Sequence, residues 1–324
     1  AEKLSSRHDG IGWEGGIGYT VGERGPRVEL DGSLNLDALA FDSPDAAVYA
    51  ASQHGMAYDA LRDRFVLFGG DTDAGESGET WEWDGTDWHN MTLPTGNPRA
   101  RTAPGLAYDA HRKRVVLFGG AHGDTFYDDT WEWDGVSWTQ VCGGGTACTG
   151  PGGRLYAPMV FDNIDGVVVM HGGCTTYTGG SCSVRTDETW TFNGTAWNKV
   201  CGSGTACSAP AVDQHGLAFD SSRDRMVLFG GRDAGGYSGK TWEWNGAGWS
   251  MVCDTMAGCD GPSRRSKLAM AFDPVKERVV LFGGTSATGY QNDTWEWNGT
   301  AWSRRTPASS PPVRRRPALA YDAA

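Results

Sequence analysis

Two histidines occupy matching sequence contexts and could act as a pair. His54 lies in SQHGMAYD, and His215 lies in DQHGLAFD. Imidazoles brought together in this way can hold a metal ion or transfer protons. No carboxylate or cysteine is predictable beside either one, and such a site needs those neighbours. The alternative is that both Gln-His pairs are repeated structural residues. The sequence therefore predicts a pair that lines a binding surface, with no catalytic residue, no metal ligand and no cofactor.

Eight cysteines fall in four close pairs, three spaced C-x5-C and one C-x7-C. Metal sites usually show C-x2-C spacing together with histidine or further cysteines. Here the intervening residues, such as GGGTA and GSGTA, are typical of loops. The spacing predicts four local disulfides, each contributing about 2 kcal/mol to stability. Disulfides indicate an oxidising location, secreted or periplasmic, with a processed N-terminus. The pairs are Cys142 with Cys148, Cys174 with Cys182, Cys201 with Cys207, and Cys253 with Cys259.

Composition excludes two classes of partner. The 324-residue chain has a formal net charge of -12, which argues against nucleic acid because no basic surface dominates. It has no apolar run of the roughly 18 residues that a membrane span needs. The 48 glycines and 15 tryptophans indicate many turns and a large buried core.

A repeated unit of about 50 to 58 residues accounts for most of the chain. Each unit has a short apolar segment such as LAYD (strand a), then RVVLFGG (strand b), TWEWDG (strand c) and a strand d that contains a tryptophan. Asp-Gly or Asn-Gly between strands c and d predicts a tight hairpin. Tryptophans at fixed strand positions are typical of core residues. The aromatic anchors of strand a are Tyr58, Tyr108, Phe161, Phe219 and Phe272.

An aspartate follows each copy of strand a, and in several copies an arginine comes three residues later, as in Asp59 and Arg62. Aspartate readily bonds its own backbone in turns. The pattern predicts a turn residue held by the arginine and not a cation site.

The two ends of the chain complete a sixth unit in this reading. LAYDAA at 319–324 matches strand a, with Tyr321 as its anchor, and GIGWEGG near the start matches strand b. VELDGSLNLDAL at 28–39 matches the c–d hairpin, with Val28, Leu30 and Leu34 in place of tryptophan. We therefore expect strands b, c and d from the N-terminus and strand a from the C-terminus to form one closing sheet.

The double glycine after strand b and the tryptophan of the c–d region resemble the kelch repeat family. This resemblance implies a single all-β domain over 1–324, a six-bladed β-propeller around a channel. The closing blade is expected to use 8–42 and 317–324. The complete blades are expected at approximately 55–93, 105–142, 157–201, 216–253 and 268–305.

In such propellers the d–a and b–c loops share one face around the channel mouth. Here the d–a loops are rich in arginine, whereas the b–c loops carry carboxylates such as Asp71 and Asp124. This face could bind an anionic group, a glycan or a peptide, although mixed charge is also ordinary on a soluble surface. The predicted binding residues are His54, Arg101, Arg154, His215, Arg264, Arg265, Arg314, Arg315 and Arg316.

Three functional hypotheses follow. The first is a secreted, non-catalytic module or scaffold that binds a protein or glycan through this face. The second is a structural subunit that self-associates by exchanging its terminal strand with a neighbour. The third is an enzyme, either a copper oxidase like some kelch-type propellers or a glycan-active enzyme. Against the oxidase, every cysteine has a nearby partner in sequence, so none is free for the thioether link that such a centre needs.

Overall fold

The computed structural model describes residues 19–22, 25–30, 34–37, 52–143, 146, 148, 150–308, 310–311 and 319–321. The prediction of an all-β chain built from repeated four-stranded antiparallel sheets is confirmed. Within these residues no helix is long and apolar enough to cross a membrane.

Five sheets, numbered here along the chain, share one strand order. Sheet 1 consists of β4 (Gly55–Asp59), β5 (Arg64–Phe68), β8 (Thr80–Trp83) and β9 (Trp88–Asn90). Sheet 2 consists of β10 (Gly105–Asp109), β11 (Arg114–Phe118), β14 (Thr130–Trp133) and β15 (Trp138–Cys142). Sheet 3 consists of β16 (Met159–Asp162), β17 (Val167–His171), β20 (Thr189–Phe192) and β21 (Trp197–Cys201). Sheet 4 consists of β22 (Gly216–Asp220), β23 (Arg225–Phe229), β26 (Lys240–Trp244) and β27 (Trp249–Asp254). Sheet 5 consists of β29 (Ala269–Asp273), β30 (Arg278–Phe282), β33 (Thr294–Trp297) and β34 (Trp302–Arg305).

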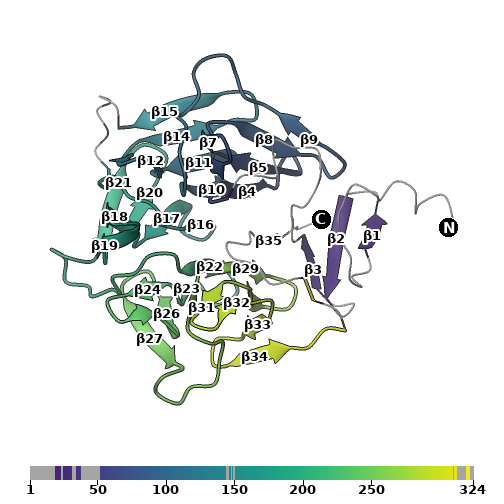
Figure 1. Ribbon diagram of the computed structural model, residues 1–324, viewed down its shortest axis with the longest axis vertical. Helices are drawn as coiled ribbons and strands as arrows, with labels where there is room; N and C mark the ends of the chain where they lie inside the picture. The colour runs from purple at the N-terminus through teal and green to yellow at the C-terminus, as the bar shows by residue number, and fades with distance from the viewer. Residues whose placement is uncertain are drawn as a thin grey trace.

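The sheets are arranged around a common centre, with the first strand of each toward it (Figure 1). Along this inner circle β4 contacts β10, β10 contacts β16, β16 contacts β22, and β22 contacts β29. The second strand of each sheet is therefore covered on both faces. In β11 the four residues from Val115 to Phe118 are all buried, which is why this strand is a continuous apolar run and does not alternate.

Tight turns form where the sequence predicts them. Asp84 Oδ1 accepts the backbone N–H groups of Thr86 and Asp87, and Gly85 has a φ of 93° that favours glycine. Asp59 Oδ1 likewise accepts the N–H of Arg62, whose Nε donates back to Asp59 Oδ2 at 2.7 Å. The predicted turn role of this aspartate is confirmed.

Five small hairpins project from the b–c loops. They are β6 (Asp71–Thr72) with β7 (Gly75–Glu76), β12 (Ala121–His122) with β13 (Thr125–Phe126), β18 (Cys174–Thr178) with β19 (Ser181–Arg185), β24 (Arg232–Asp233) with β25 (Gly236–Tyr237), and β31 (Thr285–Ser286) with β32 (Gly289–Tyr290). Each d–a loop pairs with the hairpin of the sheet that it enters, as in the bridge between Thr102 and Ala121 and in β28 (Arg265–Ser266), which pairs with β31. The expectation that these two sets of loops share one face is confirmed.

A further sheet joins strands from both ends of the chain. Its order is β1 (Tyr19–Gly22), β2 (Gly25–Leu30), β3 (Leu34–Asp37) and β35 (Ala320–Tyr321). The C-terminal strand pairs with β3, placing Leu36 opposite Tyr321. The sequence predicted that the C-terminal strand a would pair with strand b, within residues 8–16, which lie outside the described residues. This prediction of the strand order is wrong, because the C-terminal strand pairs with β3, which was predicted as strand d. The LNLD segment of β3 alternates apolar and polar residues. This pattern is compatible with a central strand and with an edge strand, so it does not decide the order of the sheet.

All four predicted disulfides are present, and the described residues contain no free cysteine. They are Cys142–Cys148, Cys174–Cys182, Cys201–Cys207 and Cys253–Cys259. They indicate an oxidising, extracellular type of environment.

Candidate functional site

Five residues at equivalent positions have a left-handed backbone, one at the inner end of each d–a loop. We call these the ring residues: Gln53, Ala103, Tyr156, Gln214 and Lys267. Their φ values are 63°, 52°, 59°, 57° and 58°. Residues other than glycine rarely adopt this conformation, which costs on the order of 1 kcal/mol or more for each. The same conformation recurs at one position in all five d–a loops, so the surrounding structure must hold the backbone in it.

The ring residues are joined by backbone hydrogen bonds from one sheet to the next. Ala103 N–H donates to the carbonyl of Gln53 at 2.7 Å, and Tyr156 N–H donates to that of Ala103 at 3.3 Å. Gln214 N–H continues the chain to Tyr156 at 3.4 Å, and Lys267 N–H donates to Gln214 at 2.8 Å. The left-handed conformation thus lets each peptide bond to the equivalent peptides of neighbouring sheets, and this series of bonds links the inner ends of the five sheets.

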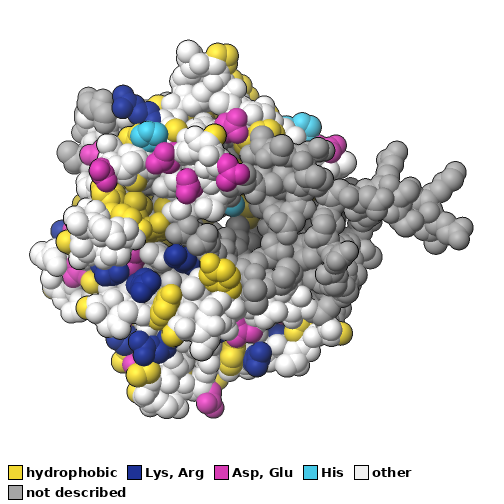
Figure 2. All heavy atoms as spheres, in the orientation of Figure 1, with side chains coloured by type: hydrophobic (Ala, Val, Ile, Leu, Met, Phe, Trp, Pro, Cys, Tyr) yellow, Lys and Arg dark blue, Asp and Glu magenta, His cyan; other side chains and the backbone are white. Residues whose placement is uncertain are grey.

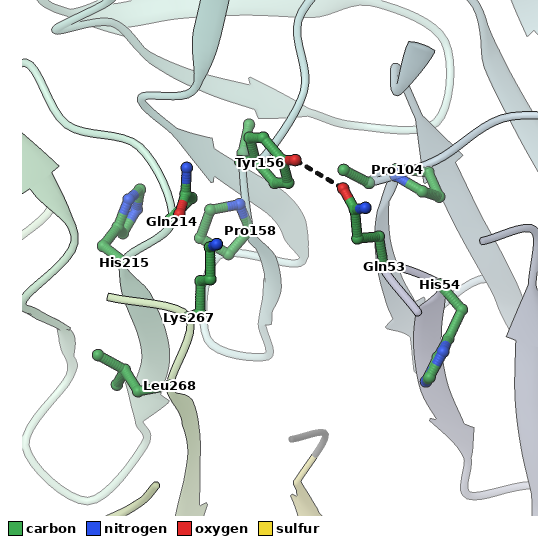
Figure 3. Close-up of a pocket in the computed structure, with 11 residues that line it drawn as sticks. Gln53, His54, Pro104, Tyr156, Pro158, Gln214, His215, Lys267 and Leu268 are labelled. Atoms are coloured by element: carbon green, nitrogen blue, oxygen red, sulfur yellow. Dashed lines mark hydrogen bonds between the residues drawn. The ribbon is translucent and has the colours of Figure 1, made fainter. Parts of the chain in front are cut away.

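A pocket of about 180 Å³ lies at these inner ends. Figure 3 shows side chains from all five sheets converging on it. Ala103, Pro104, Ala157, Pro158 and Leu268 supply apolar parts of the wall. The remaining lining residues are Gln53, His54, Tyr156, Gln214, His215 and Lys267.

Tyr156 fixes the amide of Gln53 on one wall. The tyrosine hydroxyl donates to Gln53 Oε1 at 2.6 Å, as the dashed line in Figure 3 marks. Ala103 stands between them in the ring and has only a methyl group, so the longer tyrosine can reach past it. Because the amide oxygen accepts from tyrosine, the Gln53 NH₂ group is the part that can donate to a ligand.

Gln214 presents the opposite polarity. Its NH₂ group donates to Asp213 Oδ2 at 3.1 Å, and Asp213 is fully buried and bonded to Arg185 Nε at 2.6 Å. Gln214 Oε1 is buried and has no hydrogen-bond partner among the described residues. This wall therefore offers an acceptor, whereas the Gln53 wall and the Lys267 ammonium offer donors.

Three of the predicted binding arginines are buried inside the protein. Arg101, Arg154 and Arg265 expose 0%, 2% and 1% of their surface. They form ion pairs with Asp129, Glu188 and Asp293 at the starts of the third strands. Each also donates to the carbonyl of the first glycine of the double-glycine bend, as Arg101 Nη1 does to Gly119 at 3.0 Å. These side chains anchor the d–a loops and do not face the pocket.

The double glycine is required by this anchoring. A Cβ on Gly119 would lie 2.6 Å from the backbone oxygen of Arg154, and Gly119 has a φ of 68°. The next residue, Gly120, donates its N–H to that same oxygen at 2.9 Å. The two loops approach so closely that no side chain fits between them.

Burial and charge act in opposite directions on the partner carboxyls. Burial alone would raise the pKa of Asp129, but the Arg101 guanidinium and the Trp131 indole lower it overall. The same balance lowers the pKa of Glu188 to about 2, with Arg154 as the main cause of the lowering. Both carboxylates therefore remain charged at neutral pH and hold their arginines.

The two predicted histidines line the same pocket from sheets 1 and 4, and Figure 3 shows them on opposite sides of it. The His215 ring is 4% exposed and packs on His171, with ring centroids 5.6 Å apart. Burial lowers the pKa of His215 well below its ordinary value. His215 is therefore a neutral wall residue, and the predicted pairing with His54 is limited to sharing this pocket.

One group of potential metal ligands occurs in the described part of the chain, namely Cys174, Cys182 and Asp213. Both sulfurs belong to one disulfide, so they supply no thiolate. Asp213 is held by Arg185. This group does not have the chemistry of a metal site.

The other predicted binding residues lie elsewhere. Arg264 Nε donates to the carbonyl of Tyr237 at 2.7 Å and its Nη1 contacts Met256 Sδ, in the loop that enters sheet 5. Arg314, Arg315 and Arg316 lie outside the described residues. In the sequence, Arg316 precedes Tyr321 by five positions, the same interval that separates each ring residue from its aromatic anchor.

The loop face is electrically divided. Figure 2 shows carboxylates gathered over the upper part of the molecule, where sheets 1 and 2 lie, and cationic side chains over sheets 3 and 4. Asp71, Asp73 and Asp124, in the b–c hairpins of sheets 1 and 2, are exposed. The sequence predicted arginines on the d–a loops of this face. Arg101, Arg154 and Arg265 are instead buried in ion pairs, so they add no positive charge to its surface.

Sequence reasoning did not find Gln53, Tyr156, Gln214 or Lys267 as pocket residues. The signal common to all four is position, five residues before the anchor of strand a, because only Gln53 and Gln214 share a side-chain type. The chain matches no family model, and no curated protein is significantly similar to it.

Proposed function

We propose that the chain is a six-bladed, kelch-type propeller closed by its terminal sheet, with Arg316 as the sixth ring residue. Two observations support closure. The inner strand β35 lies next to both β29 and β4, and Tyr321 in it keeps the spacing of the other anchors.

We further propose that this propeller is a secreted, non-catalytic module that binds a glycan or protein ligand at the channel mouth. The observation that carries this proposal is the pocket lined by the loops that enter all five sheets, where the Gln53 amide offers a donor and Gln214 offers a buried acceptor. A polar group that both accepts and donates hydrogen bonds fits this lining, and the proline and leucine walls exclude water around it. Arg316 would add a second cation beside Lys267.

The test is a screen of glycan and peptide arrays with the purified protein, followed by titration of the best ligand. Gln214→Ala and Arg316→Glu should each weaken binding at least tenfold while the melting temperature stays within a few degrees. Val136→Ala, an exposed residue of a c–d turn, is the matched control and should bind like the wild type. Equal affinity for all three variants would place the ligand elsewhere.

A second candidate, self-association by exchange of the terminal strand, is favoured by one specific observation. Thr294 Oγ1 in sheet 5 is buried without a hydrogen-bond partner in the described part of the chain, at a position where four other sheets receive a tryptophan from the next sheet. The described side chains at this junction thus include an unpaired hydroxyl, and in the described residues β35 is held in the terminal sheet by the two residue pairs Leu36–Tyr321 and Asp37–Ala320. Deleting 317–324 and measuring the mass in solution tests exchange, since a chain that is monomeric before and after deletion rules it out.

A further inference from the structure

The loop at 202–215, which carries Gln214 into the pocket, is anchored differently from its counterparts. The loops that end in Ala103, Tyr156 and Lys267 each hold a buried arginine two residues before the ring residue. At that position the 202–215 loop has Val212, which is 2% exposed. The carboxylate that would pair with an arginine is also missing, because Lys240 stands in its place. This loop therefore lacks the ion pair that fixes those three loops.

His171 takes over part of that role. Its Nε2 lies 3.0 Å from the carbonyl oxygen of Pro210 within the loop, and its Nδ1 lies 2.9 Å from Thr189 Oγ1. Only a protonated Nε2 can bond a carbonyl, so Nδ1 accepts from the threonine hydroxyl. That oxygen in turn accepts the Trp249 indole N–H at 2.8 Å. The imidazole is thus held in one neutral tautomer between sheet 3, sheet 4 and the loop.

The other described sheets have phenylalanine where His171 stands. Phe68, Phe118 and Phe229 each pack against the tryptophan of the next sheet at ring distances of 5.2–5.4 Å. His171 packs against Trp249 at 4.7 Å in the same way. The histidine therefore keeps the packing and adds a hydrogen bond to the loop that phenylalanine cannot make.

We propose that His171 is the positioning residue for the Gln214 wall of the pocket, and that acid releases this loop by protonating the imidazole. The imidazolium would carry a buried charge beside the neutral ring of His215. Burial and the Arg154 charge oppose protonation of His171, whereas its bond to the Pro210 carbonyl and the Asp187 charge favour it. Arg154 is itself paired with Glu188, and Asp213 of the loop is paired with Arg185, so neither Glu188 nor Asp213 is available to neutralise the imidazolium.

The direction and range of the effect follow from linkage. Burial lowers the pKa of His171 from its usual 6.5 to about 4 in the closed loop. An open loop exposes the imidazole and restores the ordinary value, so the open state binds the proton more tightly. The opening equilibrium should therefore rise as pH falls below 6.5 and level off near pH 4, by up to about 300-fold in all. The link to ligand release rests on the proposed function, whereas the opening itself does not.

Hydrogen exchange of the full protein without ligand, between pH 7.5 and 4.5, tests the proposal. After correction for intrinsic exchange, amides of 202–215 should open at least tenfold more at the acid end, whereas those of 150–158 should change little. His171→Phe restores the residue of the other sheets, so it should fold normally and open less in acid than the wild type, and the remaining acid dependence is expected from His215, the second buried imidazole of this loop. A ¹⁵N titration of the wild-type imidazole should show His171 neutral at pH 6.

Two outcomes would overturn the proposal. One is equal pH dependence of exchange in the two loops of the wild type. The other is acid-dependent opening in His171→Phe that is as large as in the wild type while that variant keeps a normal melting temperature. Neither measurement involves ligand, so a failed ligand screen would leave this result intact, and a failed exchange test would leave the pocket proposal standing.

Discussion

The indole nitrogen of Trp197 in sheet 3 donates to Thr130 Oγ1 in sheet 2 at 2.9 Å, entirely within the core. The same bond recurs at three other junctions, from Trp138 to Thr80, from Trp249 to Thr189 and from Trp302 to Thr241. Between sheets 1 and 2 the Trp133 indole also donates to Glu82 Oε1 at 2.7 Å, but the indole–threonine bond is a buried polar contact that all four junctions share. This repeated contact gives the junctions a common orientation, because a shifted sheet would leave both groups unpaired.

Thr130→Val should destabilise the protein by about 1–2 kcal/mol, because it leaves the Trp197 N–H buried without an acceptor. Urea unfolding at pH 7 measures this loss. Thr294→Val is the matched control, since the Thr294 hydroxyl has no partner in the described residues. That variant should be neutral or slightly stabilising. Equal losses in both variants would show that the threonines act through packing and not through the indole bond.

Asp129→Asn should cost about 3 kcal/mol, because it leaves the Arg101 charge buried without its counterion. Asp233→Asn, at the more exposed pair with Lys240, should cost less than about 1 kcal/mol. Chemical denaturation of both variants at one ionic strength gives the comparison. If Asp129→Asn is as mild as its control, the buried arginines are not the loop anchors described above.

Stability should fall in acid partly through Glu188. Its folded pKa of about 2 lies below the usual 4.5, so the unfolded chain binds a proton more readily. The stabilisation from this carboxylate is complete above pH 4.5 and is lost as pH falls toward 2. Glu188→Gln should therefore be less stable than the wild type at pH 7, with a smaller further loss between pH 4.5 and 2. Parallel pH profiles of unfolding free energy for the two proteins would contradict this assignment.

Replacing Cys174 and Cys182 together by alanine should lower stability by about 2 kcal/mol, the loss expected for a short disulfide loop. Cys174 is fully buried against Leu155 and Ala103, so the hairpin β18–β19 should also loosen beside the pocket. Thermal unfolding measures the first effect, and proteolysis within 174–185 measures the second. Unchanged melting and unchanged cleavage would mean that the pairing of β18 with β19 suffices by itself.

The repeated architecture could be predicted from sequence because its signals are local. Asp-Gly turns, the double glycine and the close cysteine spacing each act over a few residues, and each is present in the structure as expected. Trp133 and Trp138 are 1% and 5% exposed, as their fixed strand positions indicate. Such features need no knowledge of how the sheets meet.

The candidate site could not be predicted in the same way, because it forms only where all the sheets converge. Arg101 reads in sequence as a surface cation, and its burial depends on Asp129, 28 residues away. Gln214 and Tyr156 have no shared chemistry, and only the left-handed backbone and the hydrogen bond between their peptides relate them. His54 and His215 were placed in one pocket by repeat alignment, but the turning of His215 onto His171 depends on a substitution in sheet 3.

The proposed closed ring brings the inner ends of six sheets around one pocket and predicts that positions 267 and 316 are neighbours. Cross-linking of introduced thiols tests this arrangement, using Lys267→Cys with Arg316→Cys and a short bis-maleimide reagent. The pair Ala103→Cys with Tyr156→Cys, already joined by a backbone hydrogen bond, sets the reference yield. We predict an intramolecular cross-link between positions 267 and 316 at a similar yield. Failure of that pair to link, or linkage only between molecules, would contradict the closed ring and the pocket built on it.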